Sequence, residues 1–282
     1  MITKKKLVEE QENLLSLQGL VEVYEEIAAG KMQKERGAVI QSRYFLAGLM
    51  RMYHRAREAY SKEENTGVKL RNRNGLTVAV FVAANSGLYG DIVDKIFRDF
   101  RDYGTNNKCQ LVVLGKLGVN LMEEMMSGYM YNYFDISDDG VDLESFEMIM
   151  GYLMQFEKIV VFYGQFKSIL NQDATKTLVT GEMEDMTQKP KIDRVVYGKY
   201  LFEPSAKAIA GLFEGEILAS IFEQTLHEAS LAKYASRMLS LDRSADNILK
   251  RISKLGMTGR KLDHSNRARK QLNTFSGVRL WQ

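Results

Sequence analysis

Apolar residues recur every seven positions near the C-terminal end of the chain, and a second apolar set falls between them. The two sets are Tyr234, Leu241, Ile248, Leu255 and Leu262, and Leu231, Met238, Ala245 and Ile252. A seven-residue repeat of this kind is typical of helices that pack in a coiled coil. It predicts one long helix over residues 205–282, with an apolar seam that needs a partner.

The N-terminal end of the chain carries a similar pattern. Its apolar positions are Leu7, Leu14, Val21 and Ala28, with Leu17 and Tyr24 between them, followed by Phe45, Leu49, Met52 and Ala56. This pattern predicts a second long helix over residues 2–60, within an N-terminal segment of residues 1–62. We therefore expect the two ends of the chain to pair as a long antiparallel coiled coil.

The middle of the chain, residues 76–200, has shorter apolar runs. Strands are predicted at 77–83, 110–114 and 159–163, and helices at 92–103, around 120–131 and near 146–156, while 175–183 could add an edge strand. Strands that alternate with helices favour a small parallel sheet of the Rossmann-like α/β type. Polar segments at 63–75 and 184–194 bound this domain, and Pro204 and Ser205 suit the start of the C-terminal helix.

Composition and charge narrow the choice of partners. The chain is 45% hydrophobic and 27% charged, as in soluble globular proteins, and has no apolar run long enough to cross a bilayer. Residues 250–282 hold nine Lys or Arg against one acid, Asp263. This basic block indicates an acidic protein or nucleic-acid partner, with a solvated helix face as the alternative. The single cysteine, Cys109, indicates a reducing compartment.

No catalytic or cofactor motif is recognisable in the sequence. After the first predicted strand come only Gly87 and Gly90, without the G-x-G-x-x-G of a dinucleotide site, and Asp91 would repel a pyrophosphate. We interpret this segment as a tight surface turn. The three histidines, among them His227, stand alone in the sequence, so we expect no metal site. The expectation is a protein that has no cofactor and is not an enzyme.

Six short segments, in order along the chain, are similar to the motifs of one family. They are IAAGKMQK at 27–34, NSGLYG at 85–90, LGKLG at 114–118, YGQF at 163–166, FEPS at 202–205 and ASRM at 235–238, the last followed by Asp242, Asp246 and Asn247. The family motifs read V-A-A-S-K-M-R-K, D-R-G-L-C-G, I-G-R-K-G, Y-N-K-F, Y-E-P-S and A-A-R-M with a later D-N-A. On these segments the chain resembles the gamma subunit of the F-type ATP synthase over nearly its whole length.

The resemblance implies a non-catalytic central rotor that couples ion flow through the membrane sector to ATP synthesis or hydrolysis. The paired helices would stand inside the ring of alpha and beta subunits, with the sheet domain beside the epsilon subunit and the ring of c subunits. It implies no direct contact with nucleic acid, and a peripheral position on the cytoplasmic face of a bacterial cell membrane. Contacts with the alpha and beta subunits are expected from Lys31, Lys34, Arg237, Arg260, Asp263, His264, Arg267, Arg269 and Lys270. The turn at the foot would comprise Gly87, Leu88, Gly90 and Asp91.

The C-terminal tip departs from the family pattern Y-N-x-x-R-Q-x-x-I-T. An ungapped register places Arg260, Asp263 and His264 at the Asn, Arg and Gln of that pattern, whereas a shifted register recovers Asn266 and Arg269. We prefer the ungapped register because the insertion needed for the shift would break the heptad phase. Two alternatives stay open. One is the rotor of a divergent ATPase that is not used as a synthase, and the other is a coiled-coil scaffold that binds nucleic acid through its basic C-terminus.

Overall fold

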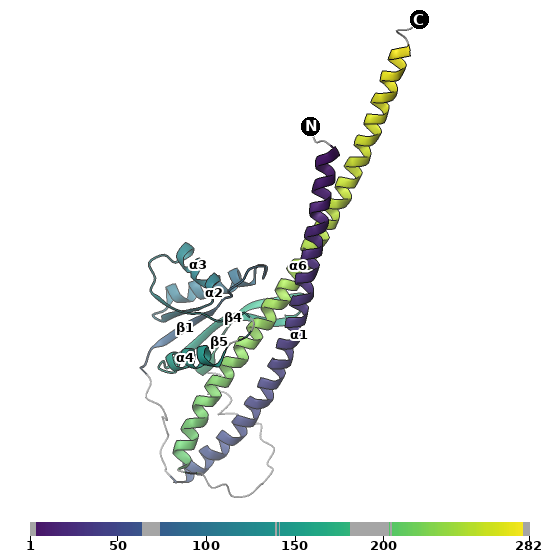
Figure 1. The fold of residues 1–282 in the computed structure, drawn as a ribbon. Helices are drawn as coiled ribbons and strands as arrows, with labels where there is room; N and C mark the ends of the chain where they lie inside the picture. The colour runs from purple at the N-terminus through teal and green to yellow at the C-terminus, as the bar shows by residue number, and fades with distance from the viewer. Residues whose placement is uncertain are drawn as a thin grey trace. The chain divides into compact units, whose positions relative to one another are not determined.

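The computed structural model describes residues 4–63, 74–138, 140, 142–180, 203 and 205–278 (Figure 1). The helices are α1 (Lys4–Glu63), α2 (Ile92–Asn106), α3 (Lys116–Met125), α4 (Leu143–Leu153) and α6 (Ala206–Val278). The strands are β1 (Thr77–Val82), β2 (Gln110–Leu114), β3 (Tyr131–Phe134), β4 (Lys158–Ser168) and β5 (Asn171–Leu178). The predicted fold class, an antiparallel coiled coil of terminal helices plus a small Rossmann-like domain, is confirmed.

By its internal contacts the chain divides into two compact units. We call Met1–Ala28 with Met238–Gln282 the terminal unit, and Ala29–Arg237 the sheet unit. Helices α1 and α6 therefore each contribute one part to the terminal unit and one part to the sheet unit. The domain limits expected from the sequence, 1–62, 76–200 and 205–282, stay predictions.

The sheet unit is built on a five-stranded sheet in the order β3-β2-β1-β4-β5. The first four strands are parallel, and β5 pairs antiparallel with β4. On one face of β1, Val78, Val80 and Val82 pack with α1, α4 and α6; on the other, Ala79 and Phe81 pack with α2 and α3. A strand buried on both faces has no alternation of apolar and polar residues, which is why β1 reads as one apolar run.

The segment between β2 and α4 differs from its prediction. The helix predicted around 120–131 is misplaced, because α3 ends at Met125 and the unpredicted strand β3 follows. Gly128 has a φ of +93°, a left-handed conformation that cannot continue a helix even though the apolar pattern runs on past it. β3 is a four-residue edge strand with the sequence YNYF, too short and too mixed in polarity to give a clear strand signal.

The elements that complete the sheet unit match their predicted types and differ at their ends. The helix predicted near 146–156 is α4, which begins at Leu143 because the carboxylate of Asp142 caps it by accepting from a backbone N–H at 2.7 Å. The strand predicted at 159–163 is longer, since β4 runs on to Ser168 and forms a hairpin with β5. That hairpin supplies the edge strand expected at 175–183, of which 181–183 lie outside the described residues.

Helix α6 begins where the sequence predicts a helix start. The hydroxyl of Ser205 accepts a hydrogen bond from the backbone N–H of Ala208 at 3.2 Å, and its carbonyl accepts from the N–H of Ile209 at 3.1 Å. A serine in this position satisfies one of the N–H groups that the first turn of a helix leaves unpaired. Pro204 and the polar segment 184–194 lie outside the described residues.

In the terminal unit, α1 and α6 run antiparallel. Ion pairs join Lys4 to Asp263 at 2.8 Å and Arg251 to Glu10 at 2.7 Å, so residue numbers fall along α6 as they rise along α1. The heptad residues are buried or half-buried: Leu7, Leu14, Val21 and Ala28 on α1, and Leu241, Ala245, Ile248, Ile252, Leu255 and Leu262 on α6. The predicted pairing of the two ends of the chain is thus present within this unit.

The prediction that Leu17 and Tyr24 lie in the seam is wrong. These side chains are 46% and 50% exposed, and the half-buried positions between the heptad residues are Gln18 and Glu25. A spacing of 3.5 residues from Leu14 falls between 17 and 18, so the period alone does not choose between them. Gln18 and Glu25 lie in the seam, where the methylene groups of their long side chains can be buried while the polar ends reach solvent. The apolar pair is left facing outward.

Gly118 allows α3 to approach the sheet closely. A Cβ placed there would lie 2.5 Å from Cγ1 of Val113 and 2.9 Å from Cβ of Ala83. We expect Gly118→Ala to lower the free energy of unfolding by about 1–3 kcal/mol, because the added methyl overpacks this interface. Gly151→Ala on α4 is the control: a Cβ there meets nothing within 4 Å, and the change should be neutral or stabilise by about 0.5–1 kcal/mol. Urea denaturation compares the two, and equal midpoints would contradict the expectation.

Candidate functional site

The turn between β1 and α2 contains the predicted foot residues Gly87, Leu88 and Gly90, and Asp91 follows it. Leu88 and Gly90 have φ values of +70° and +61°, so the chain reverses here through left-handed conformations. Gly87 and Leu88 are exposed, Leu88 to 57%. Asp91 forms an ion pair with Lys95, one turn further along α2, at 2.8 Å. These four residues therefore lie together on an exposed, tightly folded segment.

Asp138, in the loop after β3, anchors the start of this turn. Its carboxylate accepts from the backbone N–H of Asn85 at 3.0 Å, the N–H of Ser86 at 2.8 Å and the Ser86 hydroxyl at 2.7 Å. The amide of Asn85 extends the network, since its Nδ2 donates to the carbonyl of Ile136 at 2.9 Å and its Oδ1 accepts from the N–H of Lys116 at 2.7 Å. The ends of β1, β2 and β3 are thereby tied to one another.

Helix α6 brings the ammonium of Lys233 to the same carboxylate. Lys233 is 6% exposed; its Nζ donates to the carbonyl of Ala83 at 2.9 Å and lies 3.7 Å from Oδ1 of Asp138. Burial lowers the pKa of Lys233, and the Asp138 charge opposes that shift. Burial would raise the pKa of Asp138, but Lys233 and the donors on Ser86 and Asn85 outweigh it, so this pKa lies below its ordinary value. Each charge thus makes the burial of the other tolerable.

Arg237, one turn beyond Lys233, covers the outer side of the turn. Its guanidinium lies 4.2 Å from the ring centre of Tyr89, and its Nη2 donates to the Ser86 hydroxyl at 2.9 Å and to the carbonyl of Gly87. The neighbouring Ser236 donates its hydroxyl proton to the carbonyl of Tyr89 at 2.7 Å. Burial raises the pKa of Tyr89 to about 12, which keeps the phenol protonated.

We call Ser86, Tyr89, Asp138, Lys233 and Arg237 the turn hub. Tyr234 supports it, since its hydroxyl donates to the Asp138 carbonyl and its ring lies 5.7 Å from Nζ of Lys31. Within the described residues, Nε of Arg237 is the one buried side-chain nitrogen or oxygen without a hydrogen-bond partner. The polar groups of the hub are directed at one another, an arrangement that holds a turn rigidly against a helix.

Comparison with known proteins places the chain in a family. A family model described as ATP synthase matches residues 5–270. The chain belongs to the ATP synthase gamma family. The ATP synthase gamma chain of Prosthecochloris aestuarii is 23% identical over 262 residues, with 88% of this chain and 87% of the relative covered. That of Geobacter sp. is 23% identical over 240 residues, with 81% of each covered.

Solved structures agree in fold. The rotor of the Euglena gracilis mitochondrial ATP synthase matches with a TM-score of 0.58 at 16% identity, covering 95% of this chain and 98% of that one. The central stalk and c-ring structure of the Tetrahymena thermophila mitochondrial ATP synthase gives 0.56 at 16% identity, covering 80% and 99%. As a gamma subunit the chain is a non-catalytic component of its complex, which agrees with a turn hub built for rigidity.

The predicted partner-contact residues of this gamma subunit fall in both units. In the sheet unit, Lys31 and Arg237 belong to the surroundings of the turn, and Lys34 is exposed. In the terminal unit, the hydrogen bond from Lys4 lowers the pKa of Asp263 and fixes its carboxylate. The other five are exposed: Arg260, His264, Arg267, Arg269 and Lys270. Every side chain from 264 to 274 is exposed.

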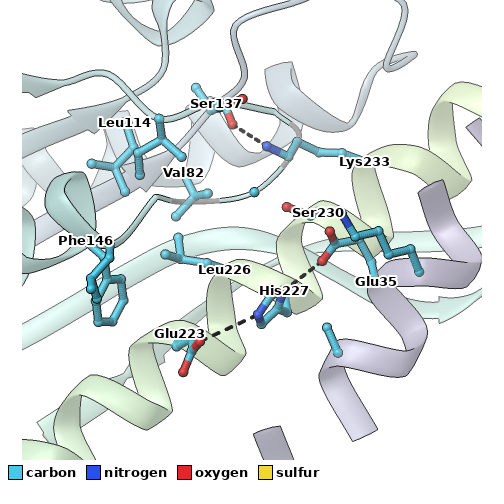
Figure 2. Close-up of a pocket in the computed structure, with 16 residues that line it drawn as sticks. Glu35, Val82, Leu114, Ser137, Phe146, Glu223, Leu226, His227, Ser230 and Lys233 are labelled. Carbon is cyan, nitrogen blue, oxygen red and sulfur yellow. Dashed lines mark hydrogen bonds and ion pairs between the residues drawn. The ribbon is translucent and has the colours of Figure 1, made fainter. Parts of the chain in front are cut away.

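Several structurally important residues were not predicted. His227, expected to stand alone, pairs through Nδ1 with the buried carboxylate of Glu35 at 2.8 Å, and its Nε2 lies 3.9 Å from Glu223 (Figure 2). The four-residue spacing from Glu223 to His227 was the available signal on α6. Glu35 lies on α1, far away in the sequence, so only the fold brings it to His227. The same holds for Asp138 in the turn hub.

The described part of the chain contains no group of His, Cys, Asp or Glu side chains that could hold a metal ion. Among its helices, none combines the length and the apolar character needed to span a bilayer. Cys109 is half-buried, and burial raises the pKa of its thiol, which disfavours the thiolate that a nucleophile requires.

Proposed function

We propose that this gamma subunit is the central rotor of an F-type ATP synthase. Its terminal unit would turn within the ring of alpha and beta subunits, and its sheet unit would stand beside the epsilon subunit and the c-subunit ring. The complex would couple ion translocation to ATP synthesis or hydrolysis. The chain would be peripheral, held through its partners at the cytoplasmic face of a bacterial cell membrane.

The observation that carries this proposal is the outward surface of α1 in the terminal unit. Apolar side chains there are 45–58% exposed: Val8, Leu15, Leu17, Leu20, Val23, Tyr24 and Ile27. Exposed apolar side chains that gather on one surface mark a place that a partner covers. A shaft enclosed by a ring of subunits needs such a surface, and the described residues of the terminal unit are two helices.

The basic tip of α6 suits contacts that must break and re-form as a rotor turns. Arg267, Arg269 and Lys270 are exposed. Exposed ion pairs contribute roughly 0.2–1 kcal/mol each, which is small enough to exchange at each step. A rotor can favour one conformation of a catalytic site only by the difference in its contact energy with the two conformations. Several weak charged contacts, different on each face of the shaft, provide such a difference.

The foot residues would meet the membrane side of the complex. Gly87 and Leu88 are exposed at the tip of the turn, and the turn hub holds that turn against α6 within the sheet unit. A force applied to the turn would therefore pass to α6 through Asp138, Lys233 and Arg237 rather than be lost in loop motion. We assign these contacts to the foot as part of the proposal.

Charge reversal at the tip tests the rotor proposal. In a complex reconstituted with Arg267→Glu, Arg269→Glu and Lys270→Glu together, we expect the ATPase rate to fall severalfold, while the thermal midpoint of the isolated chain stays unchanged, because these side chains are exposed. The matched control is Arg267→Lys, Arg269→Lys and Lys270→Arg, which keeps all three charges and should keep the rate. An unchanged rate in the reversed variant would remove these residues from the coupling role.

A second candidate, the rotor of a divergent ATPase not used as a synthase, is favoured by one observation. In the ungapped register the tip carries Arg260, Asp263 and His264 where the family pattern has Asn, Arg and Gln, and the carboxylate of Asp263 is paired with Lys4. Affinity purification distinguishes the two, because a synthase rotor copurifies with c subunits and a dedicated soluble ATPase does not. Loss of the alpha and beta subunits on nuclease treatment would instead support the nucleic-acid scaffold.

A further inference from the structure

The sheet unit contains a cavity of about 290 Å³, partly open to solvent, that the rotor role does not use (Figure 2). It lies at the carboxyl ends of β1 and β2, where Val82 and Leu114 form its floor. Helix α4 contributes Phe146, α1 contributes Ala38, and α6 closes it with the segment from Glu223 to Lys233. The carboxyl edge of a parallel sheet is where open α/β folds bind small molecules.

The cavity has an apolar side and a charged side. Figure 2 shows Val82, Leu114, Phe146 and Leu226 grouped together, and His227 facing them between two carboxylates. The sheet, α4 and Leu226 of α6 supply the apolar wall, while the charged side chains come from α1 and α6. A pocket with an apolar body and a few convergent polar groups is the usual form of a small-molecule site.

The volume indicates the size of the occupant. An engineered apolar cavity of about 150 Å³ in another protein stays dry and binds benzene. The cavity here is roughly twice as large, which matches a two-ring molecule of the size of naphthalene or indole.

The charges indicate the occupant's own charge. Glu35 is already paired with His227, and Lys233 is held by the Ala83 carbonyl and by Asp138. Glu35 and Glu223 would repel an anion, and Lys34 and Lys233 would repel a cation, so an ion of either sign would meet a like charge as it lost its water. A neutral hydroxyl or ring N–H needs only an acceptor, which the carboxylate of Glu35 offers.

We propose that this cavity binds an uncharged two-ring aromatic molecule carrying one hydrogen-bond donor, with its rings against Val82, Leu114 and Phe146 and its donor at the Glu35–His227 pair. Because α1, α6 and the strand ends all line the cavity, the occupant would contact all of these elements at once. A molecule that binds the folded unit but not the unfolded chain raises the stability of the folded unit by mass action. The inference does not depend on the rotor proposal.

The test uses the full chain and 2-naphthol as the probe. We expect saturable binding by calorimetry, an increase in the thermal midpoint with probe concentration, and a shift of the His227 side-chain NMR signal without a shift of His54 or His264. Ala38→Phe, which fills the cavity from α1, should weaken binding by about tenfold or more. Ala47→Phe, an exposed site on the same helix, is the matched control and should bind as the parent does.

Three results would overturn the proposal: no binding to the parent chain, equal binding to Ala38→Phe, or movement of His264 rather than His227. The NMR result on the parent chain stands even if Ala38→Phe does not fold. Naphthalene-2-carboxylate tests the charge argument, since it should bind about tenfold more weakly than 2-naphthol. Equal or tighter binding of the carboxylate would overturn the assignment to uncharged molecules.

Discussion

Replacing Asp138 with alanine is expected to lower the free energy of unfolding by about 3–5 kcal/mol, the typical cost of removing one partner of a buried ion pair. The ammonium of Lys233 would lose its counter-charge at a position that is 6% exposed. The backbone N–H groups of Asn85 and Ser86 would lose their acceptor at the same time. Urea denaturation followed by circular dichroism measures the change.

An exposed ion pair on the same sheet provides the control for this prediction. Asp173 pairs with Lys167 on the β4–β5 hairpin, where both side chains are about half exposed, so Asp173→Ala should cost about 0–1 kcal/mol. Adding Lys233→Met to Asp138→Ala removes the unpaired charge and should recover part of the loss. The turn hub would lose its assigned role if Asp138→Ala proved no more harmful than Asp173→Ala.

The parts of the fold that the sequence predicted are those whose pattern is set locally. β1 and β2 are buried on both faces, so each reads as an apolar run bounded by turn residues. The α6 seam from Leu241 to Leu262 repeats at a fixed period for several heptads, and a long regular pattern is the most reliable signal of a helix. The serine before α6 is a local cap and was predicted for the same reason.

The parts that it did not predict depend on contacts between distant segments. β3 becomes a strand because β2 offers its edge, and its own four residues carry no pattern that requires it. Gln18 rather than Leu17 lies in the seam because packing against α6 fixes the rotation of α1 about its own axis. In each case two local patterns were equally acceptable, and packing against another element selected one.

The candidate site was predicted in part. The turn residues Gly87 to Asp91 lie together as expected, since they are adjacent in the sequence. Asp138 and Lys233 were missed because a loop and a helix far apart in the chain bring them together. One signal was present, a lysine between Leu231 and Tyr234 on the apolar face of a helix. A lysine in such a position is rarely buried without a carboxylate nearby.

The second large effect is a dependence of stability on pH that originates at His227. The hydrogen bond with Glu35 raises its pKa, burial opposes the rise, and the charges of Glu35 and Glu223 add to it. Lys34 and Lys233 also line this side of the cavity, so charges of both signs face the ring. A histidine whose pKa is higher in the folded state binds its proton more tightly there than in the unfolded chain.

The sign of the effect follows from that difference. The extra stability is fully present below the unfolded pKa, about 6.5, and is lost as the pH rises through the folded value. We expect the urea midpoint of the parent chain to fall from pH 6 towards pH 9, and His227→Gln to remove this part of the slope. At the acidic end, His227→Gln should cost about 1.5–3 kcal/mol, the range for a hydrogen bond between charged groups.

His264→Gln is the matched control, because His264 is exposed on α6 and should leave the slope unchanged. A slope that persisted in His227→Gln, or one that rose with pH in the parent chain, would show that another group governs the titration. Above the folded pKa of His227, its neutral imidazole can still donate one hydrogen bond to Glu35. The urea midpoints of His264→Gln and His227→Gln should therefore approach each other at high pH without becoming equal. The difference in stability that remains at high pH then measures the hydrogen bond from the neutral imidazole of His227 to Glu35. The slope measures the effect of the positive charge on that imidazole alone.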